Sequence, residues 1–128
     1  MKKPLNFFKI LAISHSIIYL ITGLWPLVSI NSFQKITGPK VDLWLVKTVG
    51  ILTAVIGFTV GAAGIKREKG SPELRMVAAG GAAGLAGIDL IYVMRKRISP
   101  VYLLDALAEA GLIAGWVLEW VLEAKKMH

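Results

Sequence analysis

The 128-residue sequence contains no cysteine, which excludes disulfide bonds, thiolate nucleophiles and iron–sulfur ligation through cysteine. A phosphate-binding loop, a dinucleotide fingerprint, a nucleophile elbow and a zinc motif are also missing. The Gly80-Gly81 pair lies inside an apolar run rather than after a strand, so it does not form a nucleotide-binding turn. We therefore expect no cofactor and no metal, and a non-enzymatic role is favoured over catalysis.

Charged residues are scarce, at 18% of the chain, whereas hydrophobic residues make up 55% and the mean hydropathy is +0.65. A soluble domain of this length could not bury that much apolar surface. The formal net charge of +7 comes from short basic clusters that flank apolar runs, such as Arg95-Lys96-Arg97. This placement suits anionic lipid headgroups better than nucleic acid. The composition predicts a membrane protein whose partner is the lipid bilayer, with no nucleic acid bound.

Four long apolar runs predict four transmembrane helices, at about residues 7–28, 43–65, 72–94 and 100–124. Because the connections are short, we expect antiparallel neighbours in an all-α, integral membrane four-helix bundle that forms a single domain over residues 1–128. The first run follows a basic start, as a signal peptide does. It is long for a signal peptide and no A-x-A-like site follows it, so we expect a retained membrane helix.

The only connection of any length, residues 29–42, is expected to contain a short interfacial turn that dips Phe33 and Ile36 into the headgroups. Four spans place both termini on one side of the membrane. That side carries nine basic residues (Lys2, Lys3, Lys9, Lys66, Arg67, Lys69, Arg75, Lys125 and Lys126), against six on the other. The positive-inside rule therefore favours a multi-pass protein of the cytoplasmic (inner) membrane with both termini in the cytoplasm. The small difference leaves dual insertion open.

The second apolar run, Val41–Ile65, contains a stripe of small residues. Stepping by three or four from Lys47 gives Gly50, Ala54, Gly57, Gly61 and Gly64. Small residues let the backbone of another helix come close, so this stripe is predicted to face protein rather than lipid. Lys47 lies on the same stripe, and we expect it to point into the bundle.

Three acidic residues are predicted to lie at nearly the same depth as Lys47, below the membrane surface that bears residues 29–42. They are Asp89, Asp105 and Glu109. Charges at such depth normally face inward and pair, so we expect a polar pocket in which Lys47 pairs with one or two of the acids. Three carboxyls against one lysine leave two alternatives: one acid holds a proton, or a cationic group completes the set. The predicted ligand-binding residues are Lys47, Asp89, Asp105, Glu109, His15, Tyr19 and Tyr92, with Trp44 and Tyr102 at the mouth.

Structural roles compete with this interpretation. Lys47 and Asp105 are shallow enough to reach the interface, and His15 is more often a hydrogen-bonded packing residue than a ligand. The pairs Gly57/Gly61, Gly80/Gly84 and Gly111/Gly115 favour packing within the chain, and a homodimer through one of them stays open. An interfacial belt is expected near the end of the last helix, formed by Trp116, Trp120, Glu119 and Glu123. Its two acids are expected to pair with Lys66, Arg67 or Arg75.

The passage ITGPKVDLWLVKTVG, residues 36–50, together with the size and the four spans, resembles small bacterial membrane proteins of the DoxX-like group. That resemblance implies a fold more than an activity. The inward acids are similar in plan to the EXPERA group, which contains sterol isomerases and ligand-binding proteins; no motif aligns residue by residue. Small multidrug transporters share the size and the four spans, but their first-helix glutamate is missing here, where His15 stands instead.

Three classes of function follow from the sequence. The first is a membrane protein whose acidic pocket binds a lipid-like, amphipathic or cationic small molecule. The second is a proton-coupled transporter that acts as a dimer. The third is a non-catalytic accessory subunit in which the charges only hold the bundle together. A cavity around Glu109 favours the first class, a path shared by two copies favours the second, and charges that are all paired or exposed favour the third.

Overall fold

The computed structural model describes residues 6–126, and over this range the protein is all-helical. Its five helices are α1 (Phe7–Val28), α2 (Ile30–Thr37), α3 (Leu43–Lys66), α4 (Pro72–Met94) and α5 (Tyr102–Lys126). The four long helices lie close to the predicted ranges. The short α2 is a helix of eight residues where an interfacial turn was expected. The basic residues at positions 2 and 3, which contributed to the predicted orientation, lie outside the described residues.

Local signals explain where two of the long helices begin. The side chain of Asn6 accepts a hydrogen bond from the backbone N–H of Lys9 at the start of α1. Ser71 does the same for Leu74 at the start of α4, where Pro72 occupies the first turn. Such caps satisfy backbone donors that have no partner inside the helix, and proline at the first turn removes another.

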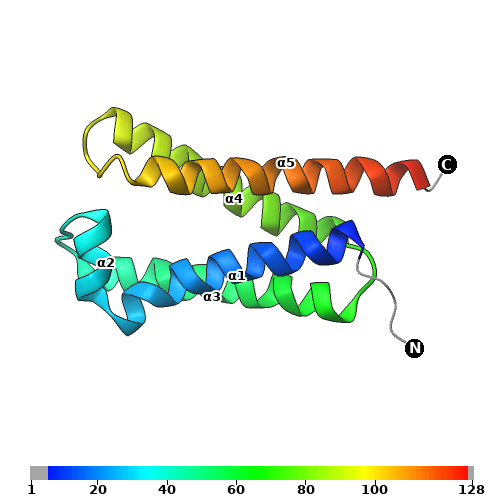
Figure 1. Ribbon diagram of the computed structural model, residues 1–128, viewed down its shortest axis with the longest axis horizontal. Coiled ribbons are helices and arrows are strands. Elements are labelled where there is room, and N and C mark those ends of the chain that lie inside the picture. Colours follow the sequence, from blue (N-terminus) through cyan, green and yellow to red (C-terminus); the bar gives the residue numbers. More distant parts are fainter. Residues whose placement is uncertain (1–5, 127–128) are drawn as a thin grey trace.

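The glycine stripe of α3 is buried against α1, and the two antiparallel helices lie side by side (Figure 1). A Cβ atom added to Gly57 would lie 2.7 Å from the Cβ of Tyr19, and one added to Gly64 would lie 2.8 Å from the Cβ of Ala12. Any side chain at these positions would push the helices apart. The prediction that the stripe faces protein is therefore confirmed for Gly50, Ala54, Gly57, Gly61 and Gly64.

Helices α4 and α5 form a second antiparallel pair, in which α4 crosses α5 obliquely (Figure 1). We call α1 with α3 the first pair, and α4 with α5 the second. The two pairs share one core, whose largest side chains are Trp116, Tyr19 and Phe8. The rings of Phe8 and Trp116 meet edge to face, 6.0 Å apart between centroids. This contact joins the first turn of α1 to the middle of α5, far from α2.

Three helices, α1, α3 and α4, are long and apolar enough to cross a membrane. This supports a membrane protein, as predicted. Helix α5 is long enough but does not meet the same criterion, because Asp105, Glu109 and Glu119 interrupt its apolar sequence. The predicted four-helix transmembrane bundle is thus seen in part, as an all-helical protein with three span-like helices.

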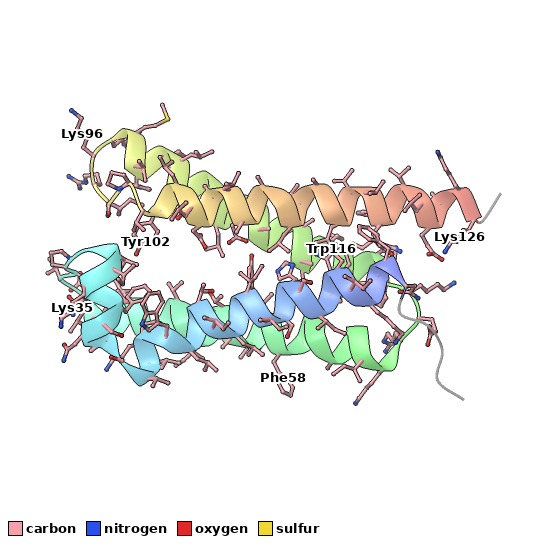
Figure 2. The ribbon with its side chains drawn as sticks, viewed as in Figure 1. Lys35, Phe58, Lys96, Tyr102, Trp116 and Lys126 are labelled. Atoms are coloured by element: carbon pink, nitrogen blue, oxygen red, sulfur yellow. The ribbon has the colours of Figure 1, made fainter. Side chains whose placement is uncertain are left out.

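Many large apolar side chains lie on the outside of the protein and several polar ones lie inside, which is the reverse of a soluble protein. Large apolar residues are exposed on every long helix, among them Phe58, which points away from α3 into the surroundings (Figure 2). By contrast His15, Glu109 and Glu119 are almost completely buried. A soluble protein rarely leaves so much contiguous apolar surface in water, whereas lipid tails cover it without cost.

Candidate functional site

The two helix pairs separate toward the α2 end and leave a cleft of about 480 Å³ between them. Its walls are mostly apolar and come from α1, α3, α4 and α5, through Ile18, Val46, Val49, Leu85, Leu104 and Ala108. Asp105 and Glu109 supply carboxyl groups from α5. Pockets for small molecules typically combine apolar walls with a few polar groups, and this cleft has that composition.

Glu109 is the most deeply buried of the predicted acids, with 1% of its surface exposed. Its Oε1 atom accepts a hydrogen bond from the hydroxyl of Tyr19, at 2.7 Å. Tyr19 is itself 1% exposed and comes from α1, so the bond joins the first pair to the second. This hydrogen bond fixes Glu109 at the point where the cleft meets the core.

Asp89 approaches the same place from α4. It is 5% exposed and lies beside Asp105, within electrostatic range of Glu109. Its Oδ2 atom is buried and has no hydrogen-bond partner among the described residues. The structure thus brings Asp89, Asp105 and Glu109 together from two helices. We call these three residues the carboxyl cluster.

The prediction that Lys47 points into the bundle is wrong, because its side chain is exposed. Gly50, one turn further along α3, packs on Gly23 and Pro26 of α1. Pro26 is two residues from the end of α1 at Val28, so little of α1 remains for the stripe to pack against at the level of Lys47. A long lysine stem then reaches the surface at low cost. Among the described residues the ion pairs are Lys9–Glu68 and Arg75–Glu119, and neither involves the carboxyl cluster.

Two predicted aromatic residues lie outside the cleft. Tyr92 is half-buried on α4 and does not line the cleft; its backbone carbonyl accepts from the N–H of Arg97 in the turn toward α5. Trp44 was expected at the mouth, but it is 66% exposed on the first turn of α3. Tyr102 does line the cleft, and it points from the start of α5 toward α2 (Figure 2).

Lys40 lies at the mouth and was not predicted from the sequence. Its Nζ atom donates to the backbone carbonyls of Thr37 and Gly38 and lies 5.1 Å from the centre of the Tyr102 ring. This cation–π contact connects the segment after α2 to α5 across the cleft. The position follows from the turn at Gly38, whose φ of 98° suits glycine, and no spacing in the sequence indicates it.

His15 lies on α1, buried against Tyr19 and Trp116, and does not line the cleft; its Nε2 atom has no hydrogen-bond partner among the described residues. The indole Nε1–H of Trp116 donates to its Nδ1 at 3.0 Å, so the ring proton of a neutral His15 is on Nε2. Trp116 was interpreted as part of an interfacial belt. That interpretation is wrong, because the residue is completely buried in the core. Arg75 was one of three basic residues expected to pair with the acids of this belt, and it does form an ion pair with Glu119.

Replacing Trp116 with phenylalanine is expected to lower the free energy of unfolding by about 1–3 kcal/mol, because His15 then loses its buried partner at Nδ1. Detergent-titrated unfolding of the purified protein, followed by circular dichroism, measures the change. Trp44→Phe is the matched control, since Trp44 is 66% exposed. Equal losses of unfolding free energy in the two variants would show that the hydrogen bond from Trp116 to His15 adds no stability beyond the packing of the aromatic ring.

No family model, curated protein or solved structure matches the chain. The resemblance to the DoxX-like group therefore stays a prediction from the sequence, and the function has to be inferred from the cleft and its carboxyl cluster.

Proposed function

We propose that the protein spans the cytoplasmic membrane with four helices, α1, α3, α4 and α5, and binds an amphipathic amine in the cleft. The arrangement of α5 supports its role as the fourth span. Leu107 and Val117 are each more than half exposed on α5, whereas its acids Glu109 and Glu119 are buried against the other helices. Glu109 and Glu119, two of the acids that lower its hydropathy, are therefore shielded from lipid, and Asp105 is half-buried.

The chemical class of the ligand follows from the charge in the cleft. Buried carboxyl groups stay ionised only when a cation or several hydrogen-bond donors accompany them, and otherwise they hold a proton. Glu109 has one donor, Tyr19, and the second oxygen of Asp89 has none among the described residues. With Lys47 at the surface, the carboxyl cluster has no lysine or arginine paired with it there. A protonated amine supplies both the charge and up to three N–H donors.

The single observation that carries this proposal is the buried, unpartnered Oδ2 of Asp89, which is next to Asp105, a residue that lines the apolar cleft. An accessory subunit held together by its charges would be expected to pair or expose all of them, and Asp89 and Glu109 are neither exposed nor in an ion pair. A dimeric transporter would need the cleft to continue into a second copy of the chain.

The proposal predicts that the detergent-purified protein binds one dodecylamine per chain, as measured by native mass spectrometry. Dodecanol, which has the same tail but no charge, is expected to bind about tenfold more weakly or less. Glu109→Gln and Asp89→Asn should each weaken dodecylamine binding about tenfold, because the amine loses a charged partner.

Glu73→Gln is the matched control, because Glu73 is an exposed acid on α4, outside the cleft. This variant should bind dodecylamine as the unmodified protein does. Equal binding of dodecanol and dodecylamine, or unchanged binding in both cluster variants, would refute an amine site. The same spectra give the number of subunits and so test the dimeric alternative.

A further inference from the structure

A second hollow lies between α3 and α4, with a volume of about 350 Å³. We call it the groove; residues that line it include Leu52, Ile56, Gly80, Gly81, Gly84 and Ile88. Leu52 and Ile88 are more than half exposed, so the groove opens on the apolar outer surface. In the proposed membrane arrangement it faces the lipid tails.

The groove and the cleft belong to one gap between the two helix pairs. Val49, Thr53 and Leu85 line both hollows. Tyr19 connects them in another way, because its side chain lines the groove while its hydroxyl bonds Glu109, which lines the cleft. The cleft and the groove are therefore adjacent, and Leu85 and Tyr19 are among the residues at their boundary.

The glycines of the groove differ from those of α3 in what surrounds them. A Cβ atom added to Gly80, Gly81 or Gly84 would meet nothing within 4 Å, whereas one added to Gly57 would collide with Tyr19. The α3 glycines are thus used for helix packing inside the chain. The α4 glycines leave open space beside the groove, although each glycine inside a helix costs about 1 kcal/mol relative to alanine.

The other way out of the cleft is less suited to a hydrocarbon chain. At the α2 end, Lys40 and the hydroxyl of Thr37 lie at the mouth, and the Lys40–Tyr102 contact crosses it. A tail leaving there would meet Phe33 and Ile36, but it would also have to pass the Lys40 ammonium and the carbonyls that it bonds, which apolar chains do not solvate. The groove offers an apolar path that ends in lipid.

We propose that the tail of the bound amine leaves the cleft through the groove and ends between α3 and α4. This inference depends on the proposed function. It narrows the ligand to a single-chain, lipid-soluble amine whose head meets Asp89, Asp105 and Glu109 and whose tail stays in contact with the bilayer. It also makes the α3–α4 face the route of entry from the membrane.

The test uses hexadecylamine with a diazirine near the end of its chain, photolysed on the full-length protein in lipid nanodiscs. We expect the label on groove residues such as Leu52, Ile56 or Ile88, identified by peptide mass spectrometry. Excess unlabelled hexadecylamine should remove it, and Glu109→Gln should lower it about tenfold.

Two glycine variants separate the groove from general effects on the protein. Gly84→Leu fills the groove and should lower the labelling there about tenfold. Gly111→Leu is the matched control and should leave the labelling unchanged, because a Cβ at Gly111 also meets nothing within 4 Å but the residue is on α5 and does not line the groove.

Two results would overturn the inference and are distinguishable. In the first, the label is found on cleft residues such as Ile18, Leu104 or Ala108, and both the competitor and Glu109→Gln remove it. The tail would then lie in the cleft and not in the groove, and the amine site would still be supported. Labelling that neither competitor nor Glu109→Gln reduces would remove the amine site itself.

Discussion

Replacing Arg75 with methionine is expected to lower the free energy of unfolding by about 3 kcal/mol, because it leaves the Glu119 carboxylate buried without a partner. The guanidinium donates from Nε to Oε1 at 2.6 Å and from Nη2 to Oε2 at 3.0 Å. The two side chains are 5% and 4% exposed. Trp120 covers the guanidinium, with its ring centre 5.5 Å from Cζ. We expect the low end of the range for buried pairs, since Arg75 lies in the first turn of α4, near an end of the bundle.

The double variant Arg75→Met with Glu119→Met tests this explanation. Removing both charges leaves nothing unpaired, so the double variant is expected to recover to within about 1 kcal/mol of the unmodified protein. Detergent-titrated unfolding of the two single variants and the double variant gives the coupling energy. If the double variant were as unstable as the sum of the single ones, the loss would come from packing and not from an unpaired charge.

The helices were predictable because their signals are local. Apolar runs of membrane length and the Ser71-Pro72 start lie within the segments that they define. The glycine stripe of α3 was predictable for a related reason, since its small residues repeat on one face and bulkier ones surround it. These patterns depend only on the geometry of a single helix.

The errors concern positions that depend on a second element. Lys47 continues the α3 stripe in sequence, but its burial depends on where α1 ends, at Val28. Trp116 was assigned to the interface because tryptophan is typical there, although it shares a helix face with Glu109 and Leu112, which are also buried. Lys40 reaches Tyr102 only because Gly38 turns the chain, and the sequence does not specify that direction.

The candidate site contains features that the sequence alone predicts and features that depend on how the helices pack. Asp89, Asp105 and Glu109 converge because α4 and α5 are antiparallel neighbours joined by a short turn, so equal distances from that turn give similar depths. The sequence contained that information. The bond from Tyr19 to Glu109 and the free oxygen of Asp89 require the packing of the first pair on the second, which only the structure supplies.

Replacing Gly57 with leucine is expected to lower the free energy of unfolding by about 3 kcal/mol, at the upper end of the usual cost of overpacking. Its Cβ would lie 2.7 Å from the Cβ of Tyr19 and 3.2 Å from the backbone N of Leu20. The second contact is with backbone, which cannot rotate away as a side-chain end can. Helix α1 would have to move off α3, and Tyr19 would move away from Glu109 with it.

Gly84→Leu is the matched control for this change, because it adds the same side chain to a membrane helix where nothing lies within 4 Å. It should alter the free energy of unfolding by less than about 1 kcal/mol, since leucine favours a helix over glycine by a similar amount. Unfolding by detergent titration compares the two variants directly. Similar stability in Gly57→Leu and Gly84→Leu would mean that α1 and α3 do not pack through the glycine stripe. A loss of stability confined to Gly57→Leu would show that α1 and α3 pack through the glycine stripe.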